Sequence, residues 1–86
     1  MAVVWLPSLL RPLAGGASTV RAAGATLRDV IDDLDRRHPG LRDRLLDNGV
    51  IRSEVAIAIG SEEVSDLNAA VGDDTEVHIL PAIAGG

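Results

Sequence analysis

The sequence predicts an α+β fold in which one helix packs against one face of a mixed β-sheet. Alternating apolar residues lie near both ends of the chain, and one amphipathic segment lies between them, as expected for strands and a helix. The chain of 86 residues has room for only one domain. Its apolar residues are almost all Val, Ile, Leu and Ala, with Trp5 the only aromatic residue, so the core must consist of aliphatic contacts between sheet and helix.

Two strands are expected near the N-terminus. Residues Ala2–Leu6 form a run rich in β-branched side chains that ends at Pro7, and Ser18–Ala22 form a second strand candidate. The residues between them, SLLRPLAGG, contain Pro12 and the Gly15–Gly16 pair, which favour a loop. We therefore expect the two strands to form a hairpin.

The amphipathic segment predicts the main helix. Thr26 is the expected N-cap, and Asp29, three residues later, is its expected capping-box partner. The sequence HPG stops the helix at Pro39. One stripe of the helix, at i, i+3, i+4 and i+7 spacing, is expected to face the core: Leu27, Val30, Ile31 and Leu34.

The opposite side of this helix is charged. Asp32 and Arg36 are four residues apart with the acid first, as are Asp33 and Arg37, and this arrangement favours ion pairs along the helix. We interpret Asp32, Asp33 and Asp35 as members of a solvated face.

The second half of the chain predicts a short helical turn and three extended segments. The turn covers Leu41–Leu46 and closes at Asn48–Gly49. A strand is expected over Ser53–Ile59, a brief extended segment around Val64, and a last strand over Thr75–Leu80. A hairpin, a crossing helix and a later strand pair, in the order ββαββ, pack most economically as a β-grasp, or ubiquitin-like, roll.

Composition excludes several functional classes. The formal charge of −5 comes from thirteen acidic residues against eight arginines, which disfavours nucleic acid or an anionic membrane as partner and favours a positively charged protein surface. Without cysteine the chain has no disulfide, no thiolate–zinc site and no Cys nucleophile. His38 and His78 alone make a poor metal site, so we expect no metal and no bound cofactor.

We also expect no enzyme active site. The sequence has no convergent set of acid, base and nucleophile. His78 is interpreted as a half-exposed residue of the last strand, and Asp73–Asp74 as an ordinary turn rather than a metal pair. A binding or carrier protein is therefore expected.

The N-terminal residues do not have the pattern of a secretion signal. A basic n-region is missing, Pro7 interrupts the apolar run, and Arg11 lies where that run should continue. No stretch approaches the ~18 apolar residues that cross a membrane. The expected compartment is the cytoplasm.

The C-terminal residues PAIAGG predict a tail. Pro81 has no N–H for a β-ladder and is expected to end the last strand, which divides the chain into a β-grasp domain, residues 1–80, and a flexible diglycine tail, residues 81–86. Fully extended, such a tail reaches about 20 Å, far enough to enter another protein's active site. Gly85 and Gly86 lack Cβ atoms and so fit a narrow channel.

The end of the chain resembles a known family. The stretch VGDDTEVHILPAIAGG, residues 71–86, is similar to the closing segment of the ThiS/MoaD sulfur-carrier proteins, in which a Gly-Asp turn leads into the last strand, a proline and Gly-Gly. LPSLLRPLAGG and VAIAIGSEEV resemble the actinobacterial branch that donates sulfur for cysteine synthesis. The resemblance covers nearly the whole chain.

The resemblance implies a carrier function. An E1-like adenylyltransferase would activate the carboxylate of Gly86 with ATP and Mg²⁺, and a sulfur donor such as a sulfurtransferase would convert it to a thiocarboxylate, with Gly85 giving access. Implied acceptors are enzymes of the cysteine synthase, thiazole synthase or thiosugar synthase kind, and a metalloprotease that releases the product is a further candidate partner. The product stays open among cysteine, thiamin, molybdopterin and a sulfur-containing secondary metabolite.

A docking face for the adenylating enzyme is expected on the sheet, opposite the helix. There the alternation leaves small or weakly polar side chains next to the tail: Ala56, Ala58, His78 and Leu80. The tail residues Pro81, Ala82, Ile83 and Ala84 are expected to extend this contact, with Ile83 as an anchor.

Two alternative functions stay open. A ubiquitin-like modifier would be activated at Gly86 in the same way but joined to lysines of target proteins. A passive β-grasp interaction module would dock with no chemistry at its tail.

Overall fold

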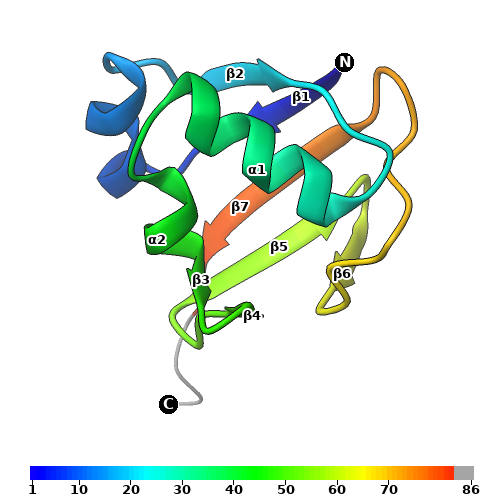
Figure 1. Cartoon of the computed structure of the whole chain (residues 1–86). Helices are drawn as coiled ribbons and strands as arrows, with labels where there is room; N and C mark the ends of the chain where they lie inside the picture. Colours follow the sequence, from blue (N-terminus) through cyan, green and yellow to red (C-terminus); the bar gives the residue numbers. More distant parts are fainter. Residues whose placement is uncertain (83–86) are drawn as a thin grey trace.

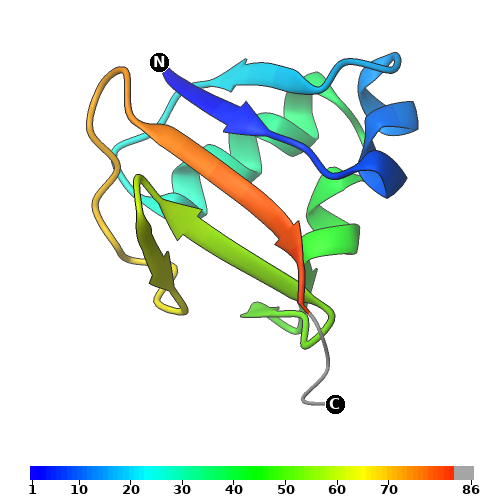
Figure 2. The same cartoon turned by 180° about the vertical axis from the view of Figure 1, so that it is seen from behind.

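A five-stranded mixed sheet organises the fold, with the strand order β2-β1-β7-β5-β6 (Figures 1 and 2). The computed structural model describes residues 1–82. β1 runs parallel to β7, and the other neighbouring strands are antiparallel, which confirms the predicted β-grasp roll. The strands are β1 (Ala2–Trp5), β2 (Thr19–Ala22), β5 (Val55–Ile59), β6 (Glu62–Val64) and β7 (Glu76–Pro81).

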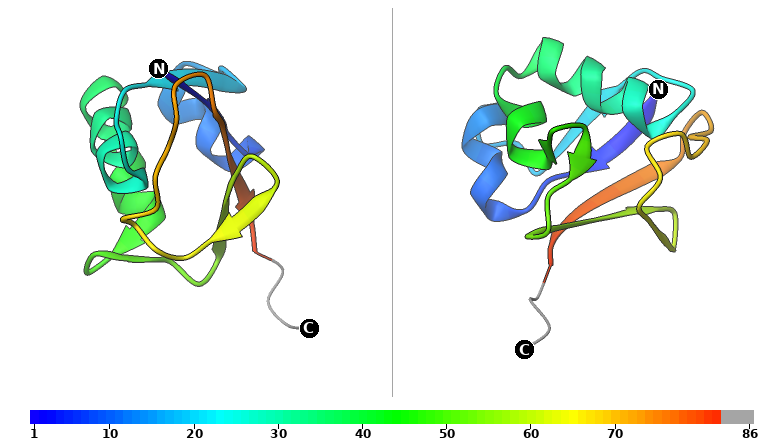
Figure 3. Two further views of the ribbon diagram at one scale, coloured as in Figure 1. Left: turned by 90° about the vertical axis from the view of Figure 1, so that its right-hand side faces the viewer. Right: turned by 60° about the horizontal axis from the view of Figure 1, so that its bottom comes forward.

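Within residues 1–82, helices cover only one face of this sheet (Figure 3). Helix α1 (Leu27–Arg37) crosses that face, and α2 (Leu41–Leu45) follows it as predicted. None of the helices within residues 1–82 is long and apolar enough to cross a membrane. The opposite face of the sheet is open in Figure 2, and the site described below lies there.

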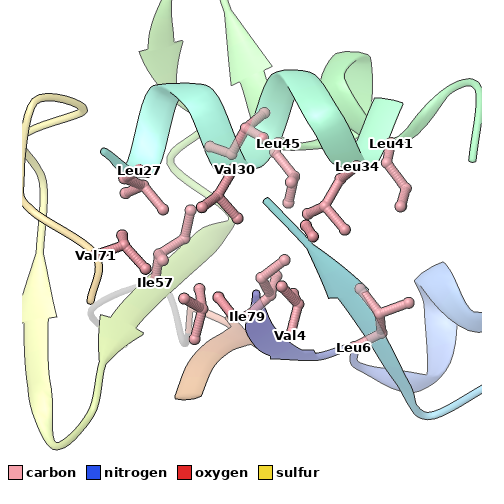
Figure 4. Close-up of a cluster of buried hydrophobic side chains, with 14 of the residues drawn as sticks. Val4, Leu6, Leu27, Val30, Leu34, Leu41, Leu45, Ile57, Val71 and Ile79 are labelled. Carbon is pink, nitrogen blue, oxygen red and sulfur yellow. The ribbon is translucent and has the colours of Figure 1, made fainter. Parts of the chain in front are cut away.

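The predicted apolar stripe of α1 lies in the core. Each of its four residues exposes at most 1% of its surface. Figure 4 shows these side chains meeting others from α2, β1, β5 and β7, among them Val4, Ile57 and Ile79. Burying each such side chain contributes roughly 1.5–3 kcal/mol, so the aliphatic cluster is the main source of stability.

The first turn of α1 is fixed to a distant segment of the chain. The Thr26 hydroxyl accepts a hydrogen bond from the N–H of Asp29 at 3.3 Å, as expected of an N-cap. The two backbone donors before Asp29 bond to the segment that precedes β7. The N–H groups of Leu27 and Arg28 donate to the carbonyls of Ala69 and Leu67 at 2.9 and 2.8 Å. These two bonds satisfy backbone N–H groups of the first helical turn that have no partner within the helix.

Asp33 departs from the prediction of a solvated helix face. It exposes only 3% of its surface, and its carboxylate accepts hydrogen bonds from the N–H of Ala23 at 2.8 Å and from Arg36 and Arg37. The Ala23 N–H, followed by the Arg36 guanidinium, holds the pKa of Asp33 far below its usual range. The predicted Asp33–Arg37 pair is confirmed, and the carboxylate ties α1 to the end of β2.

The other two acids of α1 serve the following helix. Asp32 pairs with Arg42 at 2.9 Å, so the predicted pair with Arg36 is wrong. The Asp35 carboxylate accepts from the N–H groups of Gly40 and Arg42 at 3.0 and 3.2 Å, which satisfies donors at the start of α2. Asp32 is exposed as predicted, but Asp35 is half-buried and has a structural contact.

The front segment SLLRPLAGG is a 3₁₀ helix, η1 (Ser8–Ala14), and not the expected loop. Leu10 and Ala14, four residues apart, are both buried in the core, which draws the segment into helical turns. Gly15 ends η1 with φ +66°, and the backbone N–H of Gly16 donates to the carbonyl of Arg11 at 2.7 Å.

The Asn48–Gly49 pair forms a hairpin that the sequence analysis did not predict. It joins β3 (Leu46–Asp47) to β4 (Val50–Ile51), with φ of 53° and 77° at the two turn residues. Both angles are positive, as in the two-residue turns that Asn-Gly favours. The expected strand at Ser53 starts later, at Val55, because Ser53 and Glu54 lie in a turn.

Candidate functional site

The strand register brings the predicted docking residues together on the open sheet face. Ala56 lies opposite Leu80, and Ala58 lies opposite His78, in the ladder between β5 and β7. Leu80 exposes 49% of its surface, while the two alanines and His78 are half-buried. These four residues form a weakly polar patch on β5 and β7. The two strands lie side by side on the open sheet face in Figure 2. Its role in docking stays a prediction.

Trp5 lies on the same face, and the sequence analysis did not include it in the site. It pairs with His78 between β1 and β7, and it exposes 42% of its surface. The two rings stack with centroids 5.7 Å apart and an interplanar angle of 9°. The signal was present in the sequence, because Ala2, Val4 and Leu6 take the core-facing positions and leave Trp5 on the other side.

Glu76 links these two aromatic side chains. Its Oε1 accepts a hydrogen bond from the indole Nε1–H of Trp5 at 2.9 Å and lies 3.3 Å from Nε2 of His78. His78 is half-exposed, as predicted, but it has a carboxylate neighbour. Neither neighbour carries a hydroxyl or thiol that His78 could activate, so this group does not have the arrangement of a catalytic triad.

A groove of about 500 Å³ adjoins the patch at the root of the tail. Its lining is mostly apolar and includes charged residues of both signs, Arg44 and Arg52 with Asp43 and Glu54. Leu9 of η1 stands beside it with 83% of its surface exposed. The apolar lining consists of Pro7, Leu9, Leu10, Val55, Ile79, Leu80 and Pro81. Such a groove has the size and lining to receive apolar side chains of another protein.

The last strand continues through its proline. Pro81, expected to end the strand, is its final residue and lies opposite Val55, and the N–H of Ala82 donates to the carbonyl of Glu54 at 2.9 Å. Proline lacks a donor but can occupy a terminal ladder position. The predicted tail residues Ile83, Ala84, Gly85 and Gly86 lie outside the described residues.

Residues 1–82 contain no group of three His, Cys, Asp or Glu side chains that could hold a metal ion. Asp73 and Asp74 lie in a turn, as predicted, and Asp74 has φ +60°. Asp73 faces the N-terminal amine at 3.9 Å. These acids therefore have turn and surface roles.

The fold agrees with what comparisons with known proteins show. The model of the ThiS family matches residues 4–86. The chain belongs to the ThiS family. Among relatives of this ThiS-family chain, the sulfur carrier protein CysO of Mycobacterium tuberculosis (strain ATCC 25618 / H37Rv) is 40% identical over 89 residues, 96% of each chain.

Two further similarities concern a solved complex and a protein modifier. The crystal structure of the BexX/CysO complex of Amycolatopsis orientalis contains a chain that matches with a TM-score of 0.92 and 36% identity, over 100% of both chains. Small archaeal modifier protein 3 of Haloferax volcanii is 32% identical over 65 residues, 72% of this ThiS-family chain and 71% of the modifier.

Proposed function

We propose that this chain is a sulfur carrier protein, with the sulfur held as a thiocarboxylate on the terminal carbon of Gly86. The observation that carries the proposal is a Gly-Gly sequence inside the matched family region of a chain that has no cysteine. The identity of 40% with CysO supports it. Because the chain has no cysteine, it has no side-chain thiol that could carry the sulfur. The C-terminal carboxylate is the group that the chemistry of the family uses instead.

The chemistry requires activation of the carboxylate. A C-terminal carboxylate, with a reference pKa of about 3.3–3.7, is ionised at neutral pH and resists nucleophiles. An E1-like adenylyltransferase uses ATP and Mg²⁺ so that the carboxylate oxygen attacks the α-phosphorus and pyrophosphate leaves. The terminal sulfur of a persulfide on a donor protein such as a sulfurtransferase then attacks the acyl carbon, and AMP leaves. A second thiol of the partner cleaves the resulting acyl disulfide, which releases the thiocarboxylate and leaves a disulfide on the donor. The chain is thus a co-substrate of these enzymes, in the cytoplasm where ATP is available.

We assign the docking of the adenylating enzyme to the open sheet face and the groove beside it. The patch of Ala56, Ala58, His78 and Leu80 carries little charge, and Leu80 is followed directly by Pro81 and Ala82. A partner seated there holds the tail at its root and receives Gly86 in its own active site. Ile83 serves as an anchor in this arrangement.

The acceptor is an enzyme that takes the sulfur from Gly86 into a small molecule. The crystal structure that pairs CysO with BexX in Amycolatopsis orientalis supports a protein partner of this kind. Enzymes of the cysteine synthase, thiazole synthase or thiosugar synthase kind all fit, and a metalloprotease is a further candidate where the product must be released from the carrier.

The experiment that tests the carrier function is intact-mass analysis. The chain is incubated with an activating enzyme, ATP and a sulfur source, and the expected product is heavier by the difference between one sulfur and one oxygen atom. A variant with extra residues after Gly86 is the control and should show no such change. An unchanged mass of the natural chain under conditions that convert a known family member would contradict the proposal.

A ubiquitin-like modifier is the second candidate, and the identity of 32% with small archaeal modifier protein 3 supports it. In that case Gly86 joins lysine side chains of other proteins. The same incubation in the presence of a cell extract separates the two functions, because a modifier yields adducts of higher mass and a carrier yields the thiocarboxylate.

A further inference from the structure

The only tryptophan of the chain is placed for contact with another molecule. The core is closed by aliphatic side chains, and β1 directs Trp5 to the open face with 42% of its surface exposed. Tryptophan buries a large area on binding and is enriched among residues that dominate interface energies. An exposed Trp5 beside the half-exposed Leu80 is therefore a candidate binding residue.

The indole of Trp5 is held in a fixed orientation. His78 covers one side of the ring in a nearly parallel stack, and Glu76 accepts the indole N–H. On β2 the residue opposite Trp5 is the small, exposed Thr19, and Trp5 still exposes 42% of its surface. A ring that is already held in place loses little conformational entropy when a ligand stacks on its exposed surface.

Glu76 places a negative charge at the edge of this ring. Its side chain is 55% exposed, and both of its contacts within residues 1–82 use Oε1, which leaves Oε2 to accept from a ligand. Glu63 on β6 lies on the same face, opposite Ala58, and adds a second negative charge. Arg21 on β2 lies on the same face, opposite Val3, and residues 1–82 show no ion pair between Arg21 and Glu76.

An aromatic face next to a carboxylate selects a cation. A guanidinium stacks on an indole through cation–π attraction and donates to a carboxylate from its edge, and its planar shape suits both contacts at once. The formal charge of −5 adds a long-range attraction for a basic surface. A neutral side chain can still donate to the carboxylate but lacks the cation–π and charge attraction, and an acidic side chain gains neither interaction.

We propose that Trp5, His78 and Glu76 form a recognition site for an arginine side chain of the activating enzyme. The identity of this partner rests on the proposed function, whereas the preference of the site for a guanidinium does not. Trp5 provides the surface on which the guanidinium stacks, and Glu76 provides the negative charge. His78 holds the indole ring in place by stacking on it. The site lies on the docking face beside Leu80, so one arginine binds there while Gly86 enters the partner's active site.

The preference is measured with small probes. Because Trp5 is the only tryptophan, its fluorescence and its indole N–H signal in NMR spectra report on this site alone. N-acetyl-arginine amide is titrated against N-acetyl-citrulline amide, which keeps the shape and removes the charge. We expect the arginine probe to bind about two- to fivefold more tightly than the citrulline probe.

A pair of variants separates local recognition from general charge attraction. Glu76→Gln should remove most of the preference for arginine, whereas Glu62→Gln, with the same loss of charge at another place, should keep it. Equal responses to both probes in the natural chain, or equal losses in the two variants, would overturn the proposal.

Kinetics with the activating enzyme distinguish this proposal from the carrier function. Trp5→Ala and Glu76→Gln should raise the KM for the chain about two- to fivefold and leave kcat nearly unchanged. An unchanged KM in both variants would overturn the assignment of the partner's arginine to this site. A complete lack of thiocarboxylate from the natural chain would instead contradict the carrier function and leave the probe titration unaffected.

Discussion

The backbone N–H of Ala82 donates to the carbonyl oxygen of Glu54 at 2.9 Å, so the β-ladder holds the chain one residue beyond Pro81. Residues 83–86 follow, and fully extended they reach about 13–14 Å, compared with about 20 Å for a tail that starts at Pro81. The partner's reactive centre must come within this shorter distance of Ala82. Close docking on the sheet face is therefore part of the proposed chemistry.

Removal of Gly86 should abolish thiocarboxylate formation and leave the fold intact. The deletion retains every contact described for residues 1–82, so the melting temperature should change by less than about 2 °C. Intact-mass analysis and a thermal melt of the two proteins check both statements. Sulfur transfer at the normal rate from the shortened chain would refute the role of Gly86.

Arginine at the docking face should block the adenylating enzyme. Leu80→Arg and Ala58→Arg each place a large charged group on the weakly polar patch, and we expect kcat/KM for adenylation to fall about tenfold or more, as for a central interface residue. The melting temperature should change little for Leu80→Arg, because Leu80 is 49% exposed. Ser65→Arg adds the same charge at an exposed position beyond β6 and should react normally; equal rates for all variants would rule the face out.

Periodicity was sufficient to predict the fold. In β5, β7 and α1, the spacing of apolar residues matches the repeat of the strand or helix. The type of each residue therefore indicates whether its side chain faces the core or the solvent. The same rule placed Ala56, Ala58, His78 and Leu80 on one surface. Short segments were harder to predict. The segment η1 is helical because Leu10 and Ala14 are buried against core residues from distant parts of the chain, which the local sequence does not reveal.

Contacts between distant residues could not be predicted from local patterns. Asp33 looks like a surface residue in a charged run, and only the folded chain brings the N–H of Ala23 to its carboxylate. The stack of Trp5 on His78 likewise joins residues from opposite ends of the chain. The parallel pairing of β1 with β7 produces that contact, and neither strand shows it alone.

Asp33→Asn should destabilise the fold at neutral pH and do so less in acid. The folded-state pKa of Asp33 is lowered, so its carboxylate stabilises the fold above the unfolded-state pKa of about 3.9, and this contribution is lost as the pH falls further through the folded-state value. Urea unfolding at pH 7 and at pH 3 should therefore show a smaller difference between variant and natural chain at the lower pH. Asp32→Asn, at an exposed pair with Arg42, should have little effect at either pH. A difference that stays constant between the two pH values would contradict this role of Asp33.

Gly24→Ala should destabilise the fold through direct overlap with α1. A Cβ at Gly24 would lie 2.7 Å from the backbone nitrogen of Val30 and 2.8 Å from the carbonyl carbon of Asp29, and a helix backbone cannot rotate away as a side chain can. The connection from β2 to α1 must shift instead, at a cost of about 1–3 kcal/mol in the free energy of unfolding. Gly72→Ala is a suitable control, because the group it approaches at 3.0 Å is the Thr75 hydroxyl, which can turn aside. Denaturant unfolding of both variants checks the prediction, and equal stabilities would mean that β2 and α1 are not packed as closely as the structure requires.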